Sequence, residues 1–272
     1  MKLNAQTALC CVIGNPVEHS LSPAIHNAGY NAKGLNYVYL AFPVINAEDA
    51  IKSIRALGIK GISVTVPHKL TVIQFLDRID GRAKNIGAVN SILNKSGKLI
   101  GYNTDCEGAI KALEEKTALS GKKVVLVGSG GAARAIAFGL REKNADVLIL
   151  NRTLEKAMEL AEATKARFGN LSMLNEIRKS DILINATTIG MSSGANERLV
   201  SKELLHGNLT VFDIVYNPQE TKLIAEARKM GCSIIYGYKM LLYQAVAQFE
   251  LFTESSAPVS IMEEALFKGL QR

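Results

Sequence analysis

The feature that most constrains the fold is a glycine-rich stretch near the middle of the chain, residues 124–135. Four consecutive apolar residues, mostly β-branched, end directly in glycines, and a pattern of small residues typical of a helix follows. A dinucleotide-binding turn requires this strand–turn–helix context, because glycines let the backbone turn tightly and approach a pyrophosphate. The helix start near Gly130 directs free N–H groups at the same place. We therefore expect the turn to bind a dinucleotide through Gly128, Ser129, Gly130, Gly131 and Ala132.

The glycine pattern departs from G-x-G-x-x-G at one position. Ala133 stands where the third glycine is usual, a substitution that the pattern tolerates. An ordinary tight connection between a strand and a helix is the alternative interpretation. The complete strand–glycine–helix context favours the nucleotide site.

Hydrophobic periodicity predicts alternating strands and helices along the whole chain. After the glycines, strands at residues 146–150, 182–185, 211–215 and 233–235 alternate with helices at 154–166 and 221–230. Such alternation indicates a parallel, doubly wound sheet. Before them, strands are expected at 9–13, 37–43, 59–66, 88–93 and 98–102. Helices are expected at 47–57, from Ser22 as N-cap with Pro23 at the first helical position, and from Pro67 to about residue 77.

The resulting fold class is α/β with two domains. Residues 1–106 are predicted to form an α/β substrate-binding and catalytic domain, and residues 107–239 a Rossmann-type dinucleotide-binding domain. Two apolar helices, at 240–252 and near 261–270, have no evident role in a nucleotide domain. We expect residues 240–272 to return to the first domain and complete it.

Composition narrows the classes of partner. The formal net charge is +7, but lysine and arginine are scattered among acids, without a basic tract or interleaved aromatic residues, and we expect no nucleic-acid partner. A basic surface suits small anionic substrates equally well. No apolar run approaches the ~18 residues that span a bilayer, and the first residues lack a secretory signal. The four cysteines form no C-x-x-C pair and no metal-like cluster with the four histidines. A cytoplasmic protein with no metal and no membrane partner is the prediction.

The cofactor is indicated by the residues after the second strand of the nucleotide half. Proteins that bind NAD usually place Asp or Glu there, ~20 residues past the glycines, to bind the ribose hydroxyls. Here the strand ends in Asn151-Arg152-Thr153, with Lys156 close behind, and the carboxylate is missing. Arg152, Thr153 and Lys156 offer donors and charge for a 2′-phosphate, which favours NADP(H). The alternative is a solvated arginine at a strand end.

Lys69 is the first candidate for acid–base chemistry. A predicted strand delivers Thr65 to its carboxyl end, and the helix expected from Pro67 would hold Lys69 in its first turn. A cation there opposes the helix dipole, so local stability does not explain it. The same field favours the neutral amine, which suits proton transfer near neutral pH. An exposed lysine that tolerates a poor position is the alternative.

Asp105 and two serines are the other candidates. Acids are favoured in a first helical turn, which by itself explains Asp105. An ionised Asp105 beside Lys69 would nonetheless orient the amine and balance its charge. Ser20 and Ser22 lie beside the start of a predicted helix, where two hydroxyls and free N–H groups would make a carboxylate site.

Together these residues resemble the shikimate dehydrogenase family, in the same order and over nearly the entire chain. The matching segments are Gly14-Asn15-Pro16, His19-Ser20-Leu21-Ser22-Pro23, His26-Asn27, Ser63 to Lys69, Gly87-Ala88-Val89-Asn90, Asn103-Thr104-Asp105, the glycine-rich turn, Asn151-Arg152-Thr153, Asn185-Ala186-Thr187, Asp213 with Tyr216, Gly237, Met240-Leu241 and Gln244-Ala245. No single motif would suffice, but their joint order is highly specific.

The resemblance implies NADPH-dependent, reversible reduction of 3-dehydroshikimate to shikimate in aromatic amino-acid biosynthesis. It implies that Lys69 and Asp105 form the catalytic pair. The residues implied to hold the carboxylate are Ser20, Ser22 and Tyr216, and those implied to hold the ring hydroxyls are Thr65, Asn90 and Gln244. Those implied at the nicotinamide are Thr187, Ile214, Gly237 and Met240.

Several positions depart from the usual family pattern. Ser63 replaces a common Asn, Ser91 replaces a common Thr, and Phe252 and Glu254 stand where Trp and Gly are frequent. The two serines border the expected substrate site, so a broader quinate/shikimate dehydrogenase is an alternative. A catalytically silent nucleotide-binding relative is another, which the joint retention of Lys69 and Asp105 disfavours. Both a monomer and a homodimer are compatible with the sequence.

Overall fold

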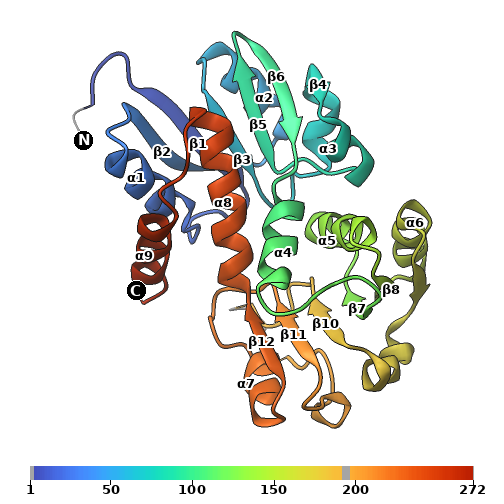
Figure 1. Cartoon of the computed structure of the whole chain (residues 1–272). Helices are drawn as coiled ribbons and strands as arrows, with labels where there is room; N and C mark the ends of the chain where they lie inside the picture. The colour runs from blue at the N-terminus through green and yellow to red at the C-terminus, as the bar shows by residue number, and fades with distance from the viewer. Residues whose placement is uncertain (1–2, 192–196, 272) are drawn as a thin grey trace. The chain divides into compact units, whose positions relative to one another are not determined.

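The computed structural model describes residues 3–191 and 197–271, which fold into two compact units (Figure 1). The first unit contains Met1–Thr104 and Gln244–Arg272, and the second contains Asp105–Tyr243. Each unit has a six-stranded sheet of its own. The predicted α/β fold class is confirmed.

The first unit contains a mixed sheet with the strand order β2-β1-β3-β5-β6-β4. Its elements are β1 (Ala8–Gly14), α1 (Ser22–Ala32), β2 (Tyr37–Pro43), α2 (Ala47–Ala56), β3 (Gly61–Val64), β4 (Arg78–Ile79), α3 (Gly81–Ile86), β5 (Ser91–Lys95) and β6 (Lys98–Tyr102). β1 pairs in parallel with β2 and β3, whereas β5 runs antiparallel to both β3 and β6. The β5–β6 hairpin turns through Ser96 and Gly97, which both have positive φ angles, as a tight hairpin requires.

The end of the chain completes the core of the first unit. α8 (Gly237–Thr253) begins in the second unit and passes into the first at Gln244, and α9 (Val259–Leu270) belongs to the first unit, where it packs against α1. Phe249 lies so close to α1 that a Cβ added to Gly29 would be 2.9 Å from its ring. The ring of Phe252 covers Gly61 of β3 in the same way, at 2.4 Å. The predicted return of the C-terminal helices to the first domain is therefore confirmed.

Two local predictions in the first unit are wrong. α1 begins at Ser22 with Leu21 as its N-cap residue, and the hydroxyl of Ser20 accepts the N–H of Ser22 at 3.3 Å. Ser22 is therefore not the cap, because Leu21 already has helical backbone angles and shifts the helix start.

The helix predicted from Pro67 is also absent, and a short 3-10 helix, η1 (Thr71–Phe75), takes its place. The N–H of Val89 donates to the Lys69 carbonyl at 2.8 Å, and the N–H of Ile73 donates to Leu70, three residues back. Val89, in the loop between α3 and β5, thus takes the carbonyl that an α-helix would use. The helix dipole on which the argument for a neutral Lys69 depended is not present.

The second unit has a fully parallel sheet with the order β12-β11-β10-β7-β8-β9, so the predicted doubly wound sheet is confirmed here. Its elements are α4 (Asp105–Glu114), β7 (Lys123–Val127), α5 (Gly131–Glu142), β8 (Asp146–Leu150), α6 (Leu154–Thr164), β9 (Arg167–Gly169), η2 (Leu171–Lys179), β10 (Ile182–Asn185), η4 (Lys202–Leu204), β11 (Thr210–Asp213), α7 (Lys222–Lys229) and β12 (Ser233–Tyr236). Separate hydrophobic clusters cover the two faces of this sheet. The strand order reverses between β7 and β10, which is where ligands bind in such sheets.

Candidate functional site

The predicted substrate residues of the first unit gather at the end of β3. The N–H of Thr65 donates to Ile13 at the end of β1, and the N–H of Asn15 donates to Val66, both at 2.9 Å. A Cβ added to Gly14 would lie only 2.3 Å from the Thr65 methyl group, so this approach requires glycine. The loop that leads to Ser20 therefore begins beside Thr65.

Lys69 and Asn90 are tied to the same edge by backbone hydrogen bonds. The N–H of Val64 donates to the Asn90 carbonyl, and the N–H of Val89 donates to the Lys69 carbonyl, both at 2.8 Å. Lys69 is half-buried, and only 2% of Asn90 is exposed. The structure thus brings Thr65, Lys69 and Asn90 together, although they are 25 positions apart in sequence at most.

Asn90 also holds the segment that leads to Asp105. Its Oδ1 accepts the N–H of Thr104 at 2.7 Å, and its Nδ2 donates to the Thr104 hydroxyl at 2.9 Å. Asp105 follows as the first residue of α4 and is buried. Asn90 thereby fixes the backbone segment from which α4 and Asp105 begin.

The remaining predicted substrate residues lie in different parts of the chain. Ser20 and Ser22 share the turn before α1, and Gln244 is a buried residue of α8. Tyr216 belongs to the second unit, just beyond β11, and burial raises the pKa of its phenol. Tyr216 is therefore a neutral hydrogen-bond donor near physiological pH.

The glycine turn of the second unit has the shape of a pyrophosphate cradle. Gly128 has a φ angle of +117°, and a Cβ there would lie 2.6 Å from the Ala186 carbonyl oxygen. Gly130 is the N-cap of α5, has a φ angle of −73°, and an added Cβ would meet no atom within 4 Å. The fold thus requires glycine at position 128. At Gly130, in contrast, there is open space beside the first N–H groups of α5. That combination fits a bound phosphate group.

The residues predicted to select NADP(H) follow β8. The Asn151 side chain donates to the Thr153 carbonyl at 2.9 Å and shapes the turn into α6. Thr153 is the N-cap residue, but its side chain makes no capping hydrogen bond. Arg152 and Lys156 are exposed, and within the described ranges no carboxylate forms an ion pair with either of them. The turn therefore presents cationic donors, as a 2′-phosphate site requires.

The residues predicted at the nicotinamide lie just after β10 and β11 and in the first turn of α8. Thr187 follows β10, and its hydroxyl and N–H both donate to Asn185 Oδ1. Gly237 approaches β11 so closely that an added Cβ would lie 2.4 Å from the Ile214 carbonyl oxygen. Met240 is buried in the hydrophobic cluster beneath.

Asp213 supports this region and was noticed in the sequence only as a motif match. Its carboxylate accepts the Thr221 hydroxyl at 2.6 Å, the Asn185 amide at 2.9 Å and the Val215 N–H at 3.1 Å. Complete burial raises its pKa to about 6, although these three donors act in the opposite direction. Asp213 thereby ties β10 and α7 to the loop that carries Ile214.

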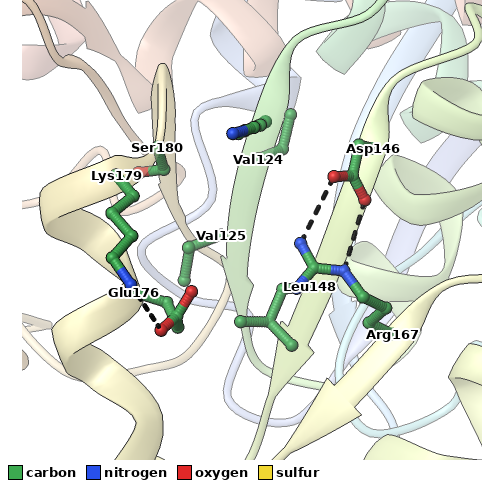
Figure 2. Close-up of a pocket in the computed structure, with 9 residues that line it drawn as sticks. Val124, Val125, Asp146, Leu148, Arg167, Glu176, Lys179 and Ser180 are labelled. Carbon is green, nitrogen blue, oxygen red and sulfur yellow. Dashed lines mark hydrogen bonds and ion pairs between the residues drawn. The ribbon is translucent and has the colours of Figure 1, made fainter.

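A pocket with a volume of about 220 Å³ lies elsewhere in the second unit, and Figure 2 shows the residues that line it. It is lined by the first residues of β7 and β8 and by the end of η2, and ion pairs join Arg167 to Asp146 and Lys179 to Glu176 at its rim. Ligands of parallel α/β sheets bind at the opposite, carboxyl ends of the strands. The cavity is therefore distinct from the predicted cofactor site.

The described residues contain neither a metal-binding cluster nor a membrane-spanning helix. In the part of the chain that the structure describes, no three His, Cys, Asp or Glu side chains are arranged to hold a metal ion. No helix in that part has the length and apolar character needed to cross a membrane.

Comparisons with known proteins match nearly the whole chain. Family models match residues 12–92 (shikimate dehydrogenase substrate binding domain), 110–226 (shikimate / quinate 5-dehydrogenase) and 237–267 (shikimate 5'-dehydrogenase C-terminal domain). The chain is 43% identical to the shikimate dehydrogenase (NADP(+)) of Methanothermobacter thermautotrophicus, covering 99% of both chains. It is 46% identical to that of Methanobrevibacter smithii, covering 98% of this chain and 99% of the relative. A crystal structure of a shikimate dehydrogenase in complex with NADP+ superposes with a TM-score of 0.94 at 42% identity, covering 100% of this chain and 98% of the other.

Proposed function

The chain belongs to the shikimate dehydrogenase family, and we propose from that premise that Lys69 and Asp105 are its catalytic acid–base pair. The enzyme is an NADP-dependent oxidoreductase that reduces 3-dehydroshikimate reversibly to shikimate, a step of aromatic amino-acid biosynthesis. The observation that carries the proposal is the close grouping of Thr65, Lys69 and Asn90 at one sheet edge, since a ketone substrate needs both a proton donor and fixed polar contacts.

In this mechanism the protein's residues handle the proton and hold the substrate. Bound NADPH supplies the hydride. Lys69 donates a proton to the carbonyl oxygen as it becomes the hydroxyl, and takes it back in the reverse direction. Asp105, the first residue of α4, is proposed to orient the amine of Lys69 for this transfer.

Six residues are proposed to hold the substrate. The carboxylate would contact the hydroxyls of Ser20, Ser22 and Tyr216, and the neutral state of Tyr216 suits donation to an anion. The ring hydroxyls would contact Thr65, Asn90 and Gln244. A flat polar ring requires several fixed hydrogen-bond partners, because unpaired buried polar groups oppose binding of a wrong substrate.

The cofactor contacts are proposed along the carboxyl edge of the second sheet. The turn from Gly128 to Ala132 would hold the pyrophosphate, supported by the open space beside Gly130. Asn151, Arg152, Thr153 and Lys156 would bind the 2′-phosphate. Thr187, Ile214, Gly237 and Met240 would lie at the nicotinamide.

The domain roles follow the same division. We propose that residues 1–106 with 240–272 bind the substrate and that residues 107–239 bind NADP(H), in a monomer or a homodimer. A family model described as a substrate binding domain matches residues 12–92, which supports the first assignment. The four cysteines are free and buried, which fits action in the reducing cytoplasm.

The test compares wild-type protein with Lys69→Ala, Asp105→Asn and the double variant, using shikimate and NADP+. Each single change should lower kcat about 10²–10⁴-fold with little change in KM. Because the two side chains act as one unit, the double variant should lose little more than the worse single variant. Lys84→Ala, an exposed lysine of α3, is the matched control and should keep normal rates. A near-normal kcat in Lys69→Ala would remove lysine from the mechanism.

A further inference from the structure

A chain of buried polar side chains runs through the first unit beside the proposed substrate residues. The Tyr39 hydroxyl donates to Ser63 Oγ at 2.5 Å, and Ser63 Oγ donates to Gln248 Oε1 at 2.8 Å. Gln248 Nε2 donates in turn to Ser91 Oγ at 2.9 Å. All four side chains are at least 95% buried, so water does not compete for these bonds. We call Tyr39, Ser63, Gln248 and Ser91 the buried relay.

The buried relay ends on Asn90. Ser91 Oγ donates to Asn90 Oδ1 at 2.9 Å, and the same oxygen accepts the N–H of Thr104. Gln248 Nε2 also approaches the Asn90 carbonyl oxygen at 3.3 Å. A flipped Asn90 amide would point its NH2 group at two donors, so these bonds fix which end of the amide faces each way.

The relay connects two of the sequence departures. Ser63 of β3 and Ser91 of β5 are directly paired across the sheet, and they stand where Asn and Thr are common in the family. Gln248 reaches both from α8, accepting from one serine and donating to the other. The two substitutions are therefore parts of one hydrogen-bonded arrangement that Gln248 completes.

The surroundings keep the relay uncharged. His26 stacks on the Tyr39 ring with centroids 4.3 Å apart, and complete burial lowers its pKa to about 3. The Gln248 amide lies near this imidazole and favours its protonation slightly, but neither ring nitrogen makes a hydrogen bond of normal geometry within the described residues. Burial raises the pKa of Tyr39 well above its usual value, although the hydroxyls of Ser63 and Ser22 act against it. The relay acts through geometry and not through charge near neutral pH.

We propose that Gln248 is a positioning residue that, by bridging Ser63 and Ser91, fixes the Asn90 amide in the orientation that receives the substrate ring. The proposal rests on the proposed role of Asn90 in substrate binding. Without Gln248, the Ser63 hydroxyl loses its acceptor and the Ser91 hydroxyl loses its donor. Ser91 can then rotate away from Asn90 Oδ1, and the amide loses one of the bonds that hold it.

The first test is Gln248→Leu, measured by initial rates with shikimate and with NADP+. We expect the KM for shikimate to rise about tenfold, the equivalent of one misplaced hydrogen bond. The KM for NADP+ should stay within about twofold, because the relay lies in the unit proposed to bind substrate. Phe249→Leu is the matched control, because Phe249 is the next residue on α8 and is equally buried. Its ring packs against Gly29 and Tyr30 of α1 and has no polar atom that could join the relay. It should lower the melting temperature and leave both KM values unchanged.

A triple variant, Tyr39→Phe/Ser63→Ala/Gln248→Leu, separates positioning from stability. It removes the stranded polar groups together, which can restore stability almost fully. Positioning by Gln248 predicts a recovered melting temperature with the KM for shikimate still raised about tenfold. A wild-type KM in a folded Gln248→Leu or triple variant would overturn the proposal while leaving the proposed function intact. Absence of shikimate turnover in the wild-type protein would instead refute the proposed function.

Discussion

Two glycines of the nucleotide turn should respond to alanine in opposite ways. Gly128→Ala should destabilise the fold, whereas Gly130→Ala should fold nearly normally and lose affinity for NADPH. The reason is that an added Cβ overlaps the Ala186 backbone at Gly128, but at Gly130 it enters open space. A bound pyrophosphate would clash with a Cβ at Gly130, whereas the protein atoms around it would not.

The magnitudes follow from the local geometry. At Gly128, a φ angle of +117° costs a residue with a side chain roughly 1–3 kcal/mol, and relief of the 2.6 Å overlap costs a similar amount. We expect a loss of about 2–6 kcal/mol, at about 2–4 °C of melting temperature per kcal/mol. At Gly130, an alanine N-cap costs about 0.5–1 kcal/mol. The dissociation constant of the Gly130→Ala variant for NADPH should rise at least about tenfold, which corresponds to a loss of about 1.4 kcal/mol of binding free energy.

Two measurements on each variant separate the effects. Far-UV circular dichroism during urea unfolding gives the free energy of unfolding, and NADPH fluorescence gives the dissociation constant. The chain contains no tryptophan, so NADPH emission is read without a tryptophan background. Normal NADPH affinity in Gly130→Ala, or wild-type stability in Gly128→Ala, would refute the assignment of the turn.

Three further predictions concern the cofactor, a buried acid and the core. Arg152→Ala should raise the KM for NADP+ about 10–100-fold while NAD+ kinetics change little, because a charge-assisted hydrogen bond to the 2′-phosphate contributes about 1.5–3 kcal/mol. Equal losses of kcat/KM with NADP+ and with NAD+ would show that Arg152 does not bind the 2′-phosphate. Asp213 has a folded-state pKa raised from 3.8 to about 6, so its contribution to stability is present below about pH 4 and is lost as the pH rises to about 6, by up to about 3 kcal/mol. Asp213→Asn should not show this pH-dependent loss of stability. The free energy of unfolding in urea should therefore favour the wild-type protein less at pH 7 than at pH 4, or favour the variant at pH 7. An equal difference between the two proteins at both pH values would contradict the raised pKa. Gly61→Ala should cost about 1–3 kcal/mol in thermal unfolding because its Cβ would meet the Phe252 ring at 2.4 Å, and a variant as stable as wild type would contradict this packing.

Local patterns predicted the second unit well because its strands and helices depend on local periodicity. The apolar run before Gly128 became β7, and the glycines became the turn into α5. The three-residue strand β9 was missed, since so short a segment has no periodicity to detect.

The features of the first unit that the sequence did not predict depend on hydrogen bonds between residues far apart in the chain. Pro67 favoured a helix locally, but Val89 took the carbonyl of Lys69. Gln248 gave no signal at all, because its partners Ser63 and Ser91 lie more than 150 positions away. The resemblance to the family supplied most of the residues proposed to touch the substrate, but neither it nor any local pattern pointed to Gln248.

The most direct test of the enzyme's function offers purified protein shikimate or quinate, each with NADP+ or NAD+, and records the initial rate of cofactor reduction. We expect the highest kcat/KM for shikimate with NADP+. Comparable rates with quinate would support the broader quinate/shikimate dehydrogenase instead. Absence of turnover with shikimate and NADP+ would contradict the account.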